Sequence, residues 1–273
     1  MRIETNLRLA KRNRQIAHFL FFFSMAVLIG GFVIANTQLT STNRESPTFA
    51  LTLFLPWLVL PIGFICTIIS IRMTNLWIRK PRPEEAIRDG LKGVSKKSVL
   101  YNYYHFPARH VLIAPQGVFA MATRFQEGKF RVEGDKWTTP TGIFGVFMRL
   151  FRRDGIGNPT EDALKAAAYV KKLIDKNNPG IEVQPLIVFV DPRANVEIVN
   201  PTVPVLYANE NQKPNLRDYM RELAQKQQLE KPAAPQQGKK KGIDKNKPAE
   251  KAAAGLDTET IADAFEEATL EAR

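Results

Sequence analysis

Basic side chains recur along one stretch of the sequence that is rich in β-forming residues. They are Arg109, Arg124, Lys129 and Arg131. Guanidinium and ammonium groups bind phosphate oxygens, so this set can serve as a patch for the phosphates of nucleic acid or of lipid headgroups. The alternative is a solvated strand face whose charges only keep the protein soluble. The net charge of +12 favours anionic partners without choosing between nucleic acid and membrane lipid.

Other chemistries find little support in the residue types. The single cysteine, Cys66, excludes an intramolecular disulfide and a cysteine-rich zinc site. His105 and His110 are expected to be structural, because no acidic partner lies near either of them in the sequence. The sequence contains no glycine-rich phosphate loop, no Ser/His/Asp arrangement and no metal-spaced cluster. We therefore expect no cofactor and no metal.

The basic residues are expected to lie on three strands within His110–Trp137. An apolar run there is followed by a Pro115-Gln116-Gly117 turn, a second apolar run to Thr123, another turn at residues 126–128, and a third strand. Glycine supplies positive φ and proline presets φ, so both residues mark turns. The pattern predicts a three-strand meander.

The meander belongs to a predicted mixed α/β domain over residues 79–230. A short helix over residues 84–91 and a strand over 98–106 precede it. Asn158 as N-cap with Pro159 behind it predicts the start of a helix. The continuous apolar run Gln184–Val190 predicts a strand buried on both faces. Strands over 194–199 and 203–207 and a helix over 215–229 complete the domain.

The stretch HVLIAPQGVFAMATRFQEGKF resembles the nuclease-related domain (NERD) family, which belongs to the PD-(D/E)XK, restriction-endonuclease-like superfamily. The residues that match the family pattern are His110, Val111, Leu112, Ile113, Pro115, Gly117, Val118, Phe119 and Gly128. The later segment with Phe189, Asp191-Pro192-Arg193 and Val196 resembles the second half of the family. The resemblance implies a restriction-endonuclease-like α/β fold.

The resemblance also implies a Mg²⁺ site made by two carboxylates on neighbouring strands, with a lysine beside them that orients the attacking water. The sequence departs from this pattern at all of these positions. Arg109 occupies the first acidic position, and the (Asp/Glu)-x-Lys triplet reads Ala122-Thr123-Arg124. Neither Arg109 nor Ala122 can ligate a hard cation. The sequence therefore predicts a degenerate nuclease-like domain without catalytic residues.

An active Mg-dependent nuclease with relocated carboxylates is the alternative. The available side chains are Glu84, Glu85, Glu127, Glu133 and Asp135. Glu127 lies about 15 Å along an extended strand from position 122, at ~3.3 Å per residue. Glu133 and Asp135 lie on the next strand, where either face is open to them. Metal-dependent cleavage of DNA or RNA would support this alternative.

Two apolar segments precede the domain. Ile16–Ala35 runs for 20 residues and Phe49–Ile71 for 23 residues without a formal charge. Helices of this length span about 30 Å, the thickness of a bilayer core, so both segments are predicted to be transmembrane helices. Residues 1–15 and the segment after residue 71 are basic, whereas the loop over 36–48 contains only Arg44. Both termini are therefore expected in the cytoplasm, at a prokaryotic inner (plasma) membrane.

Two further expectations concern the first apolar segment and its surroundings. Val33-Ile34-Ala35 resembles the cleavage site of a signal peptide, which is the rival interpretation of residues 16–35. Trp77 is expected at the membrane interface, where aromatic residues are enriched.

The C-terminal part of the sequence changes character. Residues 231–255 are rich in Pro, Ala, Gln and Lys and are expected to form a disordered basic linker. Residues 256–273 predict an acidic amphipathic helix. Its apolar face consists of Ile261, Ala264, Phe265 and Ala268. This face is expected to dock on a protein partner, or alternatively to fold back onto the chain's own domain.

The sequence as a whole predicts a membrane-anchored cytoplasmic domain that acts as a scaffold or binding module in a larger membrane assembly. The apolar segment Thr141–Phe151, too short to span a bilayer, is a second candidate surface for protein partners. Membrane lipid is an expected partner, and nucleic acid is a further one.

Overall fold

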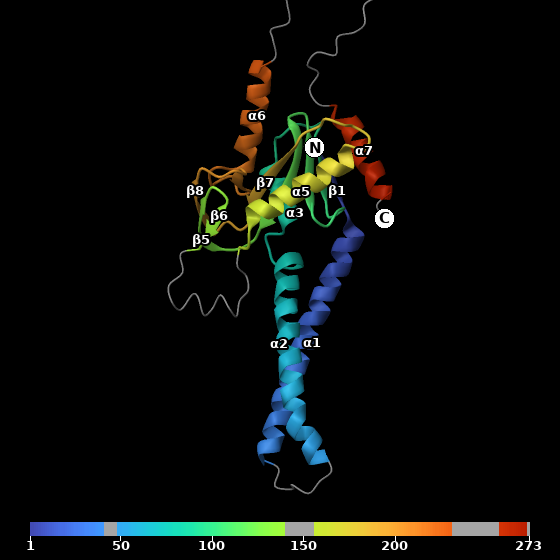
Figure 1. Cartoon of the computed structure of the whole chain (residues 1–273), viewed down its shortest axis with the longest axis vertical. Helices are drawn as coiled ribbons and strands as arrows, with labels where there is room; N and C mark the ends of the chain where they lie inside the picture. The colour runs from blue at the N-terminus through green and yellow to red at the C-terminus, as the bar shows by residue number, and fades with distance from the viewer. Residues whose placement is uncertain (41–47, 140–155, 231–256, 272–273) are drawn as a thin grey trace, which may run out of the picture.

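The protein consists of a mixed α/β domain at one end of a long pair of helices (Figure 1). The computed structural model describes residues 1–40, 48–139, 156–230 and 257–271. The predicted fold class, two long apolar helices followed by a mixed α/β domain, is confirmed. The expectations for residues 141–151 and for the linker over 231–255 lie outside the described residues.

The domain is built on a six-stranded sheet with the order β1-β2-β3-β4-β7-β9. Its strands are β1 (Arg2–Thr5), β2 (Val99–Asn102), β3 (His110–Ala114), β4 (Gly117–Arg124), β7 (Val183–Phe189) and β9 (Val205–Tyr207). β3 is antiparallel to both of its neighbours, and the other pairings in this sheet are parallel. All strands except β3 therefore end at the same edge of the sheet.

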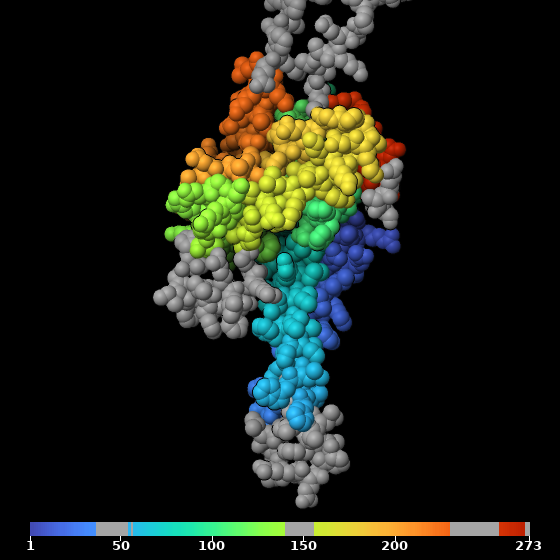
Figure 2. Space-filling model, in the orientation of Figure 1, coloured from blue at the N-terminus to red at the C-terminus, as the bar shows by residue number. Residues whose placement is uncertain are grey.

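Helices cover both faces of this sheet. They are α3 (Pro83–Gly90), α5 (Pro159–Ile174), α6 (Leu216–Glu230) and α7 (Thr258–Glu271). α5 and α7 lie side by side on one face (Figure 2), and α3 and α6 pack on the other. With both faces covered, the central strands are buried on both sides, which explains their continuous apolar runs.

Local sequence accounts for several of these elements. The side-chain oxygen of Asn158 accepts a hydrogen bond from the backbone N–H of Glu161 at 3.2 Å, so the predicted N-cap is confirmed. α3 begins at Pro83, the first helical position, where the missing N–H costs nothing. At its other end, Gly90 packs against the chain after β9. A Cβ at this position would lie 2.5 Å from the carbonyl oxygen of Ala208, so only glycine fits without a shift.

The predicted three-strand meander is wrong in its third strand. β3 and β4 form the expected hairpin, but β5 (Gly128–Glu133) belongs to a separate three-stranded sheet with β6 (Lys136–Thr138) and β8 (Ala194–Val199). The second edge of β4 is taken by β7, which pairs with it in parallel along Val118–Arg124. Gly128, at φ +113°, adopts a conformation that side chains disfavour and begins the new sheet.

The helix pair consists of α1 (Leu7–Thr40) and α2 (Thr48–Trp77). The 34 and 30 residues of these helices give lengths of about 51 and 45 Å at 1.5 Å per residue. Both helices therefore exceed the predicted segments 16–35 and 49–71, and α1 continues into what was expected to be loop 36–48. Both are long and apolar enough to cross a membrane.

The first residues of the chain have a role that their basic composition does not predict. β1 is an edge strand of the central sheet and pairs in parallel with β2, with Arg2 opposite Val99. Asn6 then starts α1, because its side-chain oxygen accepts a hydrogen bond from the N–H of Leu9 at 3.1 Å. Residues 1–15 are thus part of the folded domain, and the chain leaves the domain along α1 and returns along α2.

The junction between the helix pair and the domain is packed. Trp77 of α2 is 6% exposed and lies against Tyr103, with 4.9 Å between ring centroids, and Ala10 of α1 joins this cluster. Arg14 of α1 forms an ion pair with Glu84 of α3 at 2.7 Å. The Trp77 ring is therefore buried within the protein and not exposed to lipid, and its expected level at the membrane interface stays a prediction.

Candidate functional site

A cavity of about 370 Å³ opens at the edge of the sheet where the parallel strands end. Ligands of open α/β sheets bind outside the carboxyl ends of the strands, so this edge is where a site is expected. The edge faces the helix pair, since β1 ends here and continues directly into α1. The lining residues that carry the argument are Arg72, Phe106, Arg109, Ala122, Arg124 and Asp162.

The three positions of the expected metal site meet in this cavity. Arg109 precedes β3, Ala122 lies near the end of β4, and Arg124 ends β4. The lining residues in the described part of the chain supply four cations and one carboxylate, because Arg72 of α2 and Lys165 and Asp162 of α5 join the two arginines. A cluster of this charge attracts anions and repels Mg²⁺.

Arg124 is fixed by hydrogen bonds on every side. Its Nε donates to the carbonyl of Ile156 at 3.1 Å, one Nη donates to the carbonyl of Thr123 at 3.0 Å, and the other Nη pairs with Asp162. Burial lowers the pKa of Arg124 from its ordinary value, although the neighbouring carboxylate opposes that shift. Guanidinium groups stay protonated in proteins, so this buried charge persists at neutral pH. Asp162 neutralises it.

Arg109 has a different environment. Its guanidinium carbon lies 5.1 Å from the ring centroid of Phe106, which is a cation–π arrangement. Burial lowers its pKa, and the charges of Arg124 and Arg72 lower it further, whereas Tyr103 and the charge of Asp162 oppose the shift. In the described part of the chain, no carboxylate lies within ion-pair distance of Arg109. It is a partly buried cation without an anionic partner there.

His110 is buried beside this cavity and plays a structural part. Its Nδ1 lies 2.8 Å from the side-chain oxygen of Asn102, whose amide nitrogen donates to Thr5 at 3.1 Å. These contacts connect β3, β2 and β1 at one level of the sheet. Burial, with the nearby charge of Arg109, lowers the pKa of His110 to about 3, so the imidazole is neutral at physiological pH.

The predicted basic patch is divided between two places. Lys129 and Arg131 lie on β5 in the second sheet, where they line a different hollow with Glu197. Arg131 pairs with Glu197 at 3.0 Å and with Glu133 at 3.4 Å, and all of these side chains are solvent-exposed. The structure thus brings Arg109 and Arg124 together and leaves Lys129 and Arg131 apart from them.

Four of the five carboxylates considered for a relocated metal site, all except Asp135, pair with arginine side chains. Glu127 contacts Arg79 at 3.4 Å and also pairs with Arg193. Glu84 accepts a hydrogen bond from Tyr103 at 2.6 Å besides its pairing with Arg14. Further pairings join Glu85 to Arg82 and Glu133 to Arg131. Within the described ranges, no three His, Cys, Asp or Glu side chains lie close enough to hold a metal ion.

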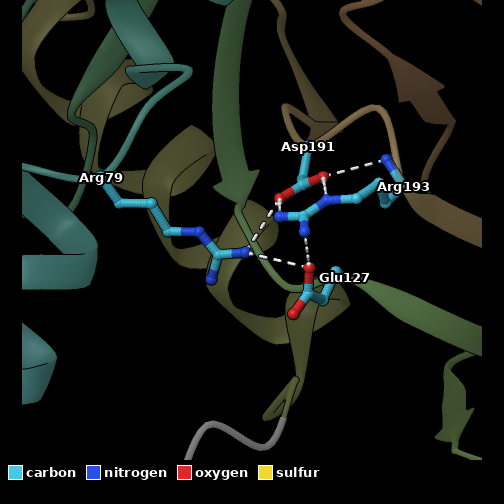
Figure 3. Close-up of polar contacts among 4 residues, drawn as sticks. All are labelled: Arg79, Glu127, Asp191 and Arg193. Atoms are coloured by element: carbon cyan, nitrogen blue, oxygen red, sulfur yellow. Dashed lines mark hydrogen bonds and ion pairs between the residues drawn. The ribbon is translucent and has the colours of Figure 1, made fainter.

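Glu127 belongs to a four-residue ion network that fastens the helix pair to the domain (Figure 3). Asp191, 2% exposed, accepts from Arg79 at 3.0 Å and from Arg193 at 2.9 Å, and both arginines also contact Glu127. Burial on its own would raise the pKa of Asp191, but hydrogen bonds and charge from Arg193, with the charge of Arg79, lower it overall. Arg79 lies just beyond α2, so this network joins the exit of α2 to the ends of β4 and β7.

The apolar face of α7 packs against the protein's own domain. The side chains expected to dock on a partner are all buried, and three of them, Ile261, Phe265 and Ala268, pack in the core cluster of the domain. Ala264 is the fourth. Phe265 lies on Tyr101, with 4.9 Å between centroids. The nitrogens of His105 bond to Tyr169 of α5 at 3.0 Å and to Thr269 of α7 at 2.8 Å. The face folds back onto its own domain, which is the alternative that the sequence left open.

Three lining residues of the cavity were missed by sequence reasoning. Arg72 was counted only as part of the basic flank after the second apolar segment, and Asp162 and Lys165 were not singled out. No motif connects these residues, because they come from α2 and α5, which are far from β4 in the sequence. The charge of Arg72 immediately after an apolar run was the one available signal.

Comparison with known proteins gives one result. No curated protein and no solved structure matches the chain. The recognition made from the β3–β4 stretch is nevertheless confirmed: residues 82–190, from α3 through β7, match the family model NERD, the nuclease-related domain.

Proposed function

We propose that the protein is a membrane-anchored cytoplasmic domain of the nuclease-related type that lacks metal-dependent catalysis and acts as a binding module. The observation that carries this proposal is the cavity at the end of β4, which is lined by Arg109 and Ala122. The resemblance to the family assigns the acidic positions to these two residues. A nuclease of this type needs carboxylate oxygens at these positions to hold Mg²⁺. An arginine there adds a positive charge of its own.

Membrane anchoring is supported by the surface of the helix pair. Large apolar side chains along it are exposed in the isolated chain, among them Phe19 at 67%, Phe32 at 68% and Trp57 at 80%. In the apolar 18-residue stretches of α1 and α2, only 17% and 11% are buried within the protein. These helices are therefore not core helices of the domain. A continuous apolar surface of this kind marks an interaction with lipid or with another protein.

The pairing of β1 with β2 argues against a cleaved signal peptide. Cleavage after Ala35 would remove β1 and expose the edge of β2 that it covers. It would also remove Arg14, which pairs with Glu84. Retention of residues 1–35 keeps the sheet complete and leaves both ends of the helix pair on the side of the domain. The basic flanks then assign that side to the cytoplasm.

Cysteine labelling tests this topology. In a Cys66→Ala background, a membrane-impermeant maleimide applied to intact cells is expected to label Ser41→Cys, between α1 and α2. The same reagent is expected to leave Lys97→Cys, on the domain, unlabelled until the membrane is opened. Labelling of Lys97→Cys in intact cells would place the domain outside. A mature protein that begins after Ala35 would support the signal-peptide interpretation instead.

Membership in a larger membrane assembly is part of the same proposal. With the apolar face of α7 covered by the domain, residues 141–151 are the other segment that the sequence predicts to bind a protein partner. Native purification in mild detergent, from cells that express either the wild type or a variant without residues 141–151, tests this role. An unchanged set of co-purifying proteins would remove it.

A further inference from the structure

The cavity at the end of β4 lies close to the expected level of the membrane surface. Arg72 is the first charged residue after the uncharged run of 23 residues in α2, and Leu76, which also lines the cavity, follows one helical turn later. Four residues of helix advance by about 6 Å. The headgroup layer on each side of a bilayer is of similar depth, about 5–8 Å. If α2 spans the membrane as proposed above, the cavity opens among the headgroups.

Two of the four cations that line the cavity have a carboxylate partner among the described residues, and two do not. Asp162 pairs with Arg124, and Lys165 pairs with Glu161 at 2.6 Å. Arg72 and Arg109 have no ion-pair partner in the described part of the chain. Arg109 is partly buried, and a buried charge is costly unless it is paired. Two unmatched guanidinium groups from α2 and from the start of β3 therefore face a common space that an anion would fill.

The size and shape of the cavity restrict that anion. Its volume is about 370 Å³, whereas a cavity needs about 10–15 Å³ on the same measure to hold one water molecule. This is enough for a phosphate group with a glycerol-sized substituent. It is too small to enclose a nucleic-acid duplex, and the adjoining helix pair restricts approach from its side. Guanidinium groups bind phosphate oxygens in bidentate geometry, so the arginines suit a phosphate well.

We propose that Arg72 and Arg109 bind the phosphate of an anionic phospholipid headgroup in the cavity at the carboxyl end of β4. Arg124 also lines the site, with its charge neutralised by Asp162. In this proposal Arg109, which stands where the nuclease-related pattern has a metal-binding carboxylate, is a phosphate-binding residue. The lipid tails remain beside α2, and the headgroup enters the cavity from the membrane surface. This proposal rests on the membrane anchoring proposed above.

Native mass spectrometry of the full chain tests the proposal. The protein is released from uncharged maltoside micelles, and titrated with short-chain phosphatidylglycerol or, in parallel, with phosphatidylcholine. We expect the wild type to retain one phosphatidylglycerol in preference to phosphatidylcholine. The Arg72→Gln/Arg109→Gln variant is expected to raise the dissociation constant by about tenfold or more, the loss of two charge-assisted contacts.

A matched control removes the same charge elsewhere. Lys171 and Lys172 lie exposed in the last turn of α5, away from the cavity, so Lys171→Gln/Lys172→Gln should change the dissociation constant by less than about twofold. The single variant Arg72→Gln, which leaves the domain untouched, is expected to weaken binding even if the double variant folds poorly. Equal weakening by the control pair would show general charge attraction and overturn the assignment.

Two further measurements separate the remaining outcomes. They are competition by inorganic phosphate and extraction of the protein from membranes with carbonate. Phosphate that competes as strongly as the short-chain lipid would overturn the lipid assignment in favour of a soluble phosphate ligand. Unchanged lipid binding in Arg72→Gln, with the protein still resistant to carbonate extraction from membranes, would overturn the site and leave the anchoring intact. Release of the wild type by carbonate would instead overturn the anchoring itself.

Discussion

Replacing Phe265 with alanine is expected to lower the free energy of unfolding of the domain by about 3–5 kcal/mol, the range for removing a buried aromatic ring from a core. Phe265 is 1% exposed and touches two other rings, with centroid distances of 4.9 Å to Tyr101 and 5.2 Å to His105. The cavity left behind would lie between α7 and the sheet. Chemical denaturation of the full chain in maltoside micelles, followed by tryptophan fluorescence, measures the change.

The neighbouring Leu270 provides the control for this substitution. It lies on the same helix but is 69% exposed, so Leu270→Ala is expected to change the free energy of unfolding by less than about 0.5 kcal/mol. If Phe265→Ala were as mild as Leu270→Ala, the packing of α7 on the domain would be contradicted. The apolar face of α7 would then again be a candidate for docking on a separate partner.

Replacing Asp191 with asparagine is expected to cost about 1.5–3 kcal/mol at pH 7, the usual contribution of a hydrogen bond to a charged group. Asparagine keeps the shape of the side chain but removes the charge that holds Arg79 and Arg193 together. Because Asp191 is 2% exposed and Arg79 is 25% exposed, solvent screens this pair less than a surface pair, whereas Arg193, at 63%, is screened more strongly. The exposed pair of Arg131 and Glu197 is the control, and Glu197→Gln should cost at most about 1 kcal/mol.

The effect of Asp191→Asn is expected to depend on pH in a defined direction. The pKa of Asp191 in the folded protein lies below its ordinary value of 3.8, so the folded state favours the charged carboxylate. Its contribution to stability is complete above the unfolded pKa and is lost as the pH falls through the folded pKa. Denaturation at pH 7 and pH 3 should therefore give a smaller difference between wild type and variant at pH 3. An equal difference at both values would contradict the charged network.

Local sequence signals predicted much of the fold because the responsible interactions are local. The N-cap at Asn158 uses a hydrogen bond that spans three residues. β7 could be recognised because a strand covered by helices on both faces needs apolar residues on both sides. The hairpin of β3 and β4 follows from its turn at residues 115–117. These elements needed no knowledge of what lies far away in the chain.

The errors concern pairings between distant segments. The sequence places β5 next to β4, but parallel pairing with β7 buries more of β4 than an exposed, half-polar strand could. β1 has only four residues, and its place in the sheet depends on β2, about a hundred residues later. Arg72 reaches the cavity only because α2 returns to the carboxyl end of β4. The charge of the site could be predicted from β3 and β4, whereas its completion by α2 and α5 could not.

We propose that positive charge has replaced metal chemistry at the end of β4. The most direct test of this claim is cleavage of labelled single- and double-stranded DNA and RNA by the full chain in lipid nanodiscs, with Mg²⁺ or Mn²⁺ and with a chelator as blank. We expect no metal-dependent cleavage, and the same result for Asp162→Ala, which removes the carboxylate that pairs with Arg124 in the cavity. Robust Mg²⁺-dependent cleavage that disappears in Glu127→Ala, Glu133→Ala or Asp162→Ala would contradict the claim and establish an active nuclease with relocated carboxylates.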